Sequence, residues 1–134
     1  MTEALWKQDA EEAGRTISEL LWKTISYNGY HEDCYHTFLA GVFVGMGYEV
    51  ESNKEKGLER PNILLKDEDN RRALIIEAKK SERESDMDRD CDNAIQQIVS
   101  RRYAEGLYGY EQILCYGIAF YRKQAKVKIL QNIV

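Results

Sequence analysis

Proline, cysteine and histidine are scarce in this chain of 134 residues, which contains one proline, three cysteines and two histidines. No two cysteines have CxxC spacing, so the sequence favours neither a disulfide framework nor a zinc ribbon. Two histidines are too few for a histidine-rich zinc site. We expect the thiols of Cys34, Cys91 and Cys115 to be reduced, as in a cytoplasmic protein.

The sequence also lacks a long apolar run and an excess of positive charge. No run approaches the roughly 18 residues of a membrane span. The first residues lack the charged and apolar regions of a secretory signal. We therefore expect no membrane contact. Nineteen basic and twenty-three acidic residues give a net charge of −4. This balance excludes a generally basic nucleic-acid-binding protein, but not a site that attracts phosphate through a metal ion.

Apolar periodicity predicts a single domain over residues 1–134 with an α/β fold, in which a mixed sheet is flanked by helices. The length is typical of one domain. Trp6 and Trp22 are expected to dock the first helix. The predicted helices cover residues 3–26, 32–46 and 91–106, and the predicted strands cover 48–51, 63–65, 73–76, 113–120 and 125–130.

A polar cluster is predicted at the ends of two apolar strands. Asn62 opens one strand, and Glu77 and Lys79 close the next. Alternation places Glu77 and Lys79 on one face, and a hairpin would bring Asn62 beside them. A carboxylate there can hold a divalent cation, with the Ala78 carbonyl as a further ligand, and a lysine can orient or deprotonate water. The alternative is a solvent-exposed ion pair at a strand end.

Four motifs in this order resemble the PD-(D/E)XK nuclease superfamily. The closest resemblance is to the small nuclease-like domains found at the C-terminus of predicted AAA-type ATPases. It covers about residues 18–122 and implies a restriction-endonuclease-like α-β-β-β-α-β core. The motifs are a helix with Tyr35-His36, the stretch from Ser52 to Ile63, the strand Ile75-Ile76-Glu77-Ala78-Lys79 and the helix segment Ala94-Ile95-Gln96-Gln97-Ile98.

The resemblance implies catalytic roles for the matched residues. Glu77 would be a metal ligand and Lys79 the catalytic lysine, while Gln97 would contact the site or the scissile phosphate. Glu32 could contact the metal or a water. His36 would face the same cleft, although a buried histidine bonded to the backbone is an equal alternative.

A rim of polar and basic residues is predicted to contact nucleic acid. A charged surface without a ligand is the alternative for its arginines. The predicted rim residues are Ser52, Arg60, Lys80, Arg101 and Arg102.

One position departs from the family pattern at the metal site. The family's metal-binding aspartate falls on Asn62, whose amide oxygen brings no negative charge. Glu77 and Lys79 then nearly cancel, so we expect reduced affinity for Mg²⁺ or Mn²⁺. Glu59, where the family usually has glycine, might supply a carboxylate instead after rearrangement. Asn62 is explained either by an engineered inactivating substitution or by a natural loss of activity.

The sequence thus predicts a metal-dependent nuclease that hydrolyses DNA, or alternatively RNA, and is impaired by Asn62. A second hypothesis is a non-catalytic module of the same fold that binds nucleic acid or protein. A third is an assembly domain that forms a homodimer through the first helix and the strand region 125–134.

Overall fold

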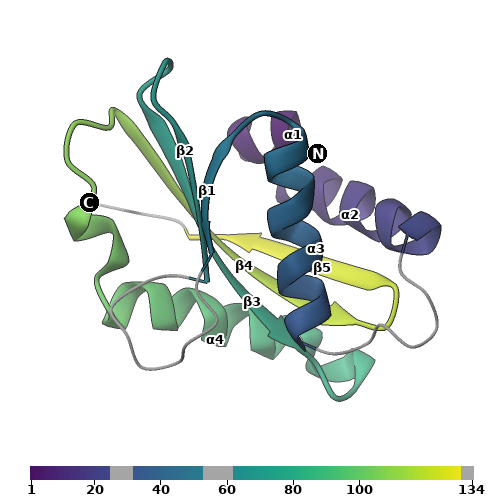
Figure 1. The fold of residues 1–134 in the computed structure, drawn as a ribbon. Helices are drawn as coiled ribbons and strands as arrows, with labels where there is room; N and C mark the ends of the chain where they lie inside the picture. Colours follow the sequence, from purple (N-terminus) through teal and green to yellow (C-terminus); the bar gives the residue numbers. More distant parts are fainter. Residues whose placement is uncertain (25–31, 53–61, 131–134) are drawn as a thin grey trace.

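The computed structural model describes residues 1–24, 32–52 and 62–130 (Figure 1). The order of helices and strands in these residues confirms the predicted α/β class. The first half contains helices α1 (Thr2–Trp6), α2 (Ala10–Thr24) and α3 (Glu32–Gly45), followed by strands β1 (Glu49–Ser52), β2 (Ile63–Asp67) and β3 (Arg72–Lys80). The second half contains the 3₁₀ helix η1 (Glu84–Asp86), helix α4 (Met87–Ser100), the 3₁₀ helix η2 (Tyr103–Gly106) and strands β4 (Gln112–Tyr121) and β5 (Gln124–Ile129).

The five described strands form one mixed sheet in the order β1-β2-β3-β4-β5. β3 and β4 run parallel, and the other neighbouring pairs are antiparallel. A parallel pair needs a crossover connection, which α4 provides between β3 and β4. The parallel register places Glu77 opposite Gly117 and Lys79 opposite Ala119.

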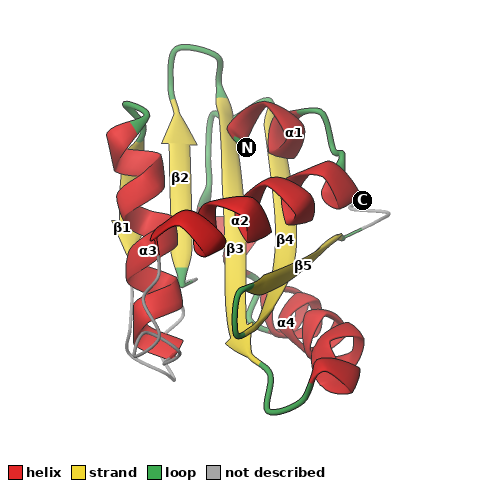
Figure 2. Cartoon of the chain, turned by 90° about the vertical axis from the view of Figure 1, so that its right-hand side faces the viewer, coloured by secondary structure: helices red, strands yellow, loops and turns green. Residues whose placement is uncertain are grey.

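Helices cover both faces of the sheet, with α2 and α3 in front and α4 behind in Figure 2. Successive side chains of β3 alternate between these faces. Ile76 and Ala78 pack in the core under α2 and α3, whereas Ile75 packs with Ile98 of α4. Glu77 follows the same alternation as Ile75, so its side chain lies on the α4 face of the sheet.

Close contact between α4 and β4 depends on Gly117. A Cβ atom at this position would lie 2.5 Å from the backbone carbonyl oxygen of Cys91, and 3.1 Å from the side chains of Ala94 and Ile95. Only glycine lets the helix backbone approach this closely. The contact sets the height of α4 above the sheet and therefore the position of the polar residues that α4 carries.

The predicted first helix, residues 3–26, is wrong as a single element, because the described part forms two helices. Gln8 adopts a left-handed conformation with φ of 64°, which interrupts the helical path. The Asp9 carboxylate then accepts a hydrogen bond from the Glu12 backbone N–H at 3.1 Å. This side-chain cap satisfies a donor at the start of α2. Residues 25 and 26 lie outside the described residues.

The predicted helix over 91–106 is displaced. α4 begins earlier, at Met87, and ends at Ser100. Arg102 has φ of 54°, so the α-helix stops there and the short η2 follows. Regular helical spacing of apolar residues does not reveal a single left-handed residue.

The two tryptophans have different environments. Trp6 is buried, and its Nε1 donates a hydrogen bond to the Tyr48 hydroxyl at 3.1 Å. The expectation that Trp22 docks the first helix is wrong, because Trp22 is 69% exposed at the end of α2. Its position on the exposed side of an amphipathic helix accounts for the difference.

Candidate active site

Four of the predicted site residues come together where β2 begins and β3 ends. β2 and β3 are antiparallel, with Ile63 opposite Ile76, so Asn62 lies next to the second half of β3. That half carries Glu77 and Lys79. Gln97 projects from the third turn of α4, which packs over the same face. These elements meet because a hairpin and a crossover helix share one edge of the sheet.

Glu77 is the buried acidic residue of this cluster, with 1% of its surface exposed. Oε1 accepts a hydrogen bond from the Asn62 backbone N–H at 2.8 Å, and Oε2 accepts one from Gln97 Nε2 at 3.0 Å. Burying a carboxylate without such partners is costly. The two donors therefore hold the carboxylate in a fixed orientation at the end of the sheet.

Gln97 connects the two charged side chains of β3. Its Oε1 accepts a hydrogen bond from Lys79 Nζ at 2.8 Å, while its Nε2 donates to Glu77. An ammonium group can only donate and a carboxylate can only accept, so the orientation of the amide is determined by its partners. Glu77, Lys79 and Gln97 therefore act as one hydrogen-bonded unit.

The orientation of Asn62 is determined in the same way. Its Oδ1 accepts a hydrogen bond from the Ala78 backbone N–H at 2.9 Å. The second terminal atom of the side chain must then be Nδ2. An amide nitrogen donates hydrogen bonds and does not serve as a cation ligand. An aspartate in this conformation would present a carboxylate oxygen at that position.

His36 contacts the backbone at the start of β2. Its Nε2 lies 2.9 Å from the Asn62 carbonyl oxygen and 2.8 Å from Ser52 Oγ, and the residue is 4% exposed. A carbonyl only accepts, so Nε2 carries the proton, with Ser52 Oγ as a second acceptor. This geometry matches the alternative of a buried histidine bonded to the backbone. His36 therefore links Ser52, which is exposed at the end of β1, to the backbone at the start of β2.

The other predicted residues that the structure describes are dispersed. Lys80 is half-buried and alternates to the opposite face from Lys79. Arg101 is exposed one helical turn beyond Gln97, and Arg102 forms the left-handed stop after α4. Glu32 begins α3, but its side chain lies outside the described part of the structure, as do the whole residues Glu59 and Arg60.

Sequence reasoning missed two contacts of this region. The Ala78 backbone contributes its N–H to Asn62, whereas the pattern pointed to its carbonyl. Tyr35, next to His36 on α3, donates a hydrogen bond from its hydroxyl to the Arg122 carbonyl at 2.7 Å. The hairpin register could have indicated the first contact. The second joins residues 87 positions apart, and no local pattern signals it.

The described residues of the polar cluster provide few ligands for a metal ion. Among the described residues, no three His, Cys, Asp or Glu side chains gather as metal ligands. Glu77 is the acidic member of the network, and both of its oxygens already accept hydrogen bonds. Asn62 offers no charge, and Oδ1 is turned to the backbone. The described residues therefore do not fit a tightly bound divalent cation.

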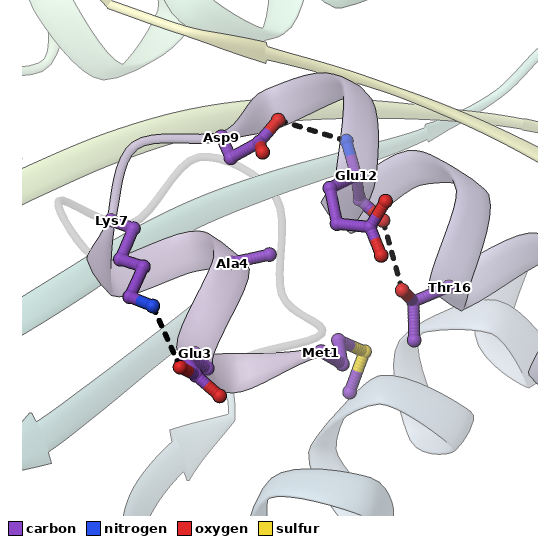
Figure 3. Close-up of a pocket in the computed structure, with 7 residues that line it drawn as sticks. All are labelled: Met1, Glu3, Ala4, Lys7, Asp9, Glu12 and Thr16. Atoms are coloured by element: carbon purple, nitrogen blue, oxygen red, sulfur yellow. Dashed lines mark hydrogen bonds and ion pairs between the residues drawn. The ribbon is translucent and has the colours of Figure 1, made fainter.

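A separate pocket of about 280 Å³ lies between α1 and α2 (Figure 3). Its polar groups bond to one another, through Lys7 to Glu3 at 2.7 Å and through the Asp9 cap of α2. These contacts stabilise the turn between the helices, and we assign no ligand to it. The lining residues are Met1, Glu3, Ala4, Lys7, Asp9, Glu12 and Thr16.

The part of the chain that forms this site matches a known protein family. A family model described as PD-(D/E)XK nuclease superfamily matches residues 30–129. The match runs from the segment before α3 to the end of β5, and it includes Asn62, Glu77, Lys79 and Gln97. Among curated proteins, none matches the sequence.

Proposed function

Because the chain belongs to the PD-(D/E)XK nuclease superfamily, we propose that it is a nucleic-acid-binding nuclease domain whose phosphodiester hydrolysis is impaired by Asn62. DNA is the proposed substrate, with RNA as the alternative. The observation that carries this proposal is the Asn62 amide, whose oxygen is held by the Ala78 N–H and whose nitrogen occupies the second terminal position.

The proposed catalytic group consists of Glu77, Lys79 and Gln97. The Lys79 ammonium would orient a water or stabilise negative charge on the phosphate. Gln97 would hold the side chains of Lys79 and Glu77 in fixed relative positions through its two hydrogen bonds. Nucleases of this superfamily usually use divalent metals. We propose that Mg²⁺ or Mn²⁺ binds this chain weakly, because Glu77 supplies one negative charge and Lys79 opposes it.

Binding without hydrolysis is a second candidate function. The oxygens of Glu77 and the Oδ1 of Asn62 all accept hydrogen bonds from the protein itself, which favours a site stabilised without a metal. In this case the same fold would bind nucleic acid, or a protein, and would not cut. The two candidates differ in what the substitution Asn62→Asp does.

The test is a cleavage assay of the wild type, Asn62→Asp and Asn62→Ala. Plasmid DNA, single-stranded DNA and RNA are each offered with Mg²⁺ and with Mn²⁺. We expect cleavage from Asn62→Asp alone, because only this change supplies the missing carboxylate at unchanged side-chain size. Glu77→Gln added to Asn62→Asp should abolish the cleavage.

Two results would contradict the proposal. Equal cleavage by the wild type and Asn62→Asp would show that Asn62 does not impair the site. No cleavage and no Mn²⁺ binding by Asn62→Asp would favour the non-catalytic module.

We also propose an assembly state and a cellular location for the protein. We propose a cytoplasmic location and, following the third hypothesis from the sequence, assembly into a homodimer. No helix in the described ranges is both long and apolar enough to cross a membrane. Sedimentation of the chain with and without residues 1–18 tests the assembly hypothesis.

A further inference from the structure

Cationic and aromatic side chains alternate where the β4–β5 turn meets the end of α2. Arg122 and Lys123 form the turn. The Arg122 guanidinium lies 5.2 Å from the centre of the Tyr121 ring, and Lys123 Nζ lies 4.8 Å from the centre of the Trp22 ring. We call these four residues the hairpin platform.

The hairpin platform combines two kinds of side chain that proteins use to bind single-stranded nucleic acid, aromatic rings and cations. Trp22 is 69% exposed, although tryptophan is among the largest apolar side chains. Exposed aromatic rings stack with bases of any sequence, and neighbouring Lys and Arg side chains attract the phosphates. Arg122 is exposed, and Lys123 is half-buried against the indole.

The cations of the hairpin platform differ from the other lysines of this hairpin. Lys126 Nζ lies 3.0 Å from an Asp88 oxygen. Lys128 Nζ lies 2.9 Å from Asp88 and 3.0 Å from Asp92. These ion pairs join β5 to α4. Within the described ranges, no carboxylate forms a salt bridge with Arg122 or Lys123, so their positive charges are not neutralised in this way.

The β4–β5 turn lies at the same edge of the sheet as the candidate active site, whereas Trp22 lies on α2, which covers the face opposite to α4. β3 and β4 are parallel, with Lys79 opposite Ala119, and the Ser81 N–H donates to the Phe120 carbonyl at 2.7 Å. Arg122 follows two residues after Phe120. Figure 2 shows the β4–β5 turn beside the end of β3.

Two consecutive residues of helix α3 contact the β4–β5 turn and the start of β2. The Tyr35 hydroxyl donates to the Arg122 carbonyl at 2.7 Å, and its ring stacks on Phe120 with ring centres 4.5 Å apart. His36 holds the Asn62 carbonyl at 2.9 Å. The turn and the strand that carries Asn62 are therefore anchored to one helix at adjacent positions.

We propose that the hairpin platform binds a single-stranded segment of the nucleic acid that the candidate site engages. A base stacks on the open part of the Trp22 indole, and Arg122 and Lys123 contact the flanking phosphates. This inference rests on the proposed binding of nucleic acid, but not on its hydrolysis.

The first test measures the affinity of the full chain for a fluorescent oligothymidine by anisotropy, in EDTA so that no cleavage occurs. Trp22→Ala should raise Kd by about 10-fold, because a stacking contact is lost. Arg122→Gln with Lys123→Gln should reduce the slope of log K against log salt by about 1.4. Oligouridine and a DNA duplex form the other arms, and the duplex should respond least to Trp22→Ala.

Matched controls lie at the opposite end of the sheet. Tyr108 is 87% exposed and Arg71 is exposed, and they stand before β4 and β3 respectively. Tyr108→Ala and Arg71→Gln should leave Kd within about 2-fold of the wild type. Equal losses in the control and hairpin-platform variants would overturn the proposal, because attraction would then be general.

A second readout follows Trp22 directly. Trp6→Phe leaves Trp22 as the remaining tryptophan, and the far-ultraviolet circular dichroism of this variant verifies its fold. Oligothymidine should quench its fluorescence in a saturable manner, with the Kd found by anisotropy. Binding without quenching would overturn the stacking contact. Preferential quenching by the duplex would overturn the single-stranded assignment.

The two proposals fail separately. Quenching of Trp22 without cleavage by Asn62→Asp would support the hairpin platform and reject the hydrolysis. Cleavage by Asn62→Asp with Trp22→Ala binding as tightly as the wild type would reject the hairpin platform alone.

Discussion

At the scale of single residues, the site is determined by which atoms accept and which donate. Asparagine and aspartate have the same shape, but the amide oxygen of Asn62 already accepts a hydrogen bond from the Ala78 N–H. What remains is a nitrogen where aspartate would place an oxygen. The change in chemistry is therefore larger than the loss of one charge. The residue types could be predicted from the sequence, but this orientation required the register of β2 against β3.

Gln97 should contribute to stability through its bond to the buried Glu77. Gln97→Ala removes one donor from a carboxylate that is 1% exposed, so we expect a loss of about 1–3 kcal/mol in the free energy of unfolding. Urea unfolding measures this loss. Gln96→Ala is the matched control, because Gln96 is exposed on the same helix and should change stability by less than about 0.5 kcal/mol. Equal effects of the two substitutions would show that this hydrogen bond does not contribute to the free energy of unfolding.

At the scale of elements, the position of α4 determines whether Gln97 can reach β3. The sequence predicts the helix from the apolar spacing of Ala94, Ile95 and Ile98, which are buried. It does not predict where the helix ends, because the left-handed Arg102 depends on how the chain returns to the sheet. Nor does it indicate the role of Gly117, which lies in the middle of an apolar strand and takes its importance from a helix that precedes it in the chain.

Gly117→Ala should destabilise the protein by about 1–3 kcal/mol, because the new Cβ would meet the Cys91 carbonyl at 2.5 Å and α4 would have to move. Gly41→Ala is the matched control. Gly41 lies inside α3, and a Cβ added there would meet nothing within 4 Å, so the change should stabilise the helix by up to about 1 kcal/mol. Chemical denaturation of both variants decides the matter. A neutral Gly117→Ala would mean that α4 lies farther from β4 than described.

At the scale of the whole molecule, apolar residues pack on both faces of the sheet, and the site lies on the α4 face. The alternation of apolar residues predicts this layering, and the family resemblance predicts the order of the core elements. Trp22 shows the limit of such prediction, because a large apolar residue was expected to pack and is instead exposed. The structure shows that the Lys123 ammonium group lies over the Trp22 ring, a contact that the sequence does not indicate.

Two cysteines report on the packing of α4 against the sheet, because Cys91 lies on α4 and Cys115 packs with Ile98 of α4. Burial raises the pKa of Cys91 and of Cys115 to about 11, so both thiols are almost fully protonated at neutral pH and react poorly, since the thiolate is the nucleophile. Cys34 is half-buried. We expect iodoacetamide to modify Cys34 first in the folded protein, and all three residues in urea, as mass spectrometry will show. Rapid native labelling of Cys91 or Cys115 would contradict the described packing.

The most direct test of the central claim is Mn²⁺ binding by the wild type and by Asn62→Asp, measured by titration calorimetry without nucleic acid. The account predicts weak or undetectable binding to the wild type and at least about 10-fold tighter binding to Asn62→Asp, because the second terminal atom becomes an oxygen with negative charge. Glu77→Gln in the Asn62→Asp background should remove the gain. Equal Mn²⁺ affinity of the wild type and Asn62→Asp would contradict the claim that the Asn62 amide weakens the metal site.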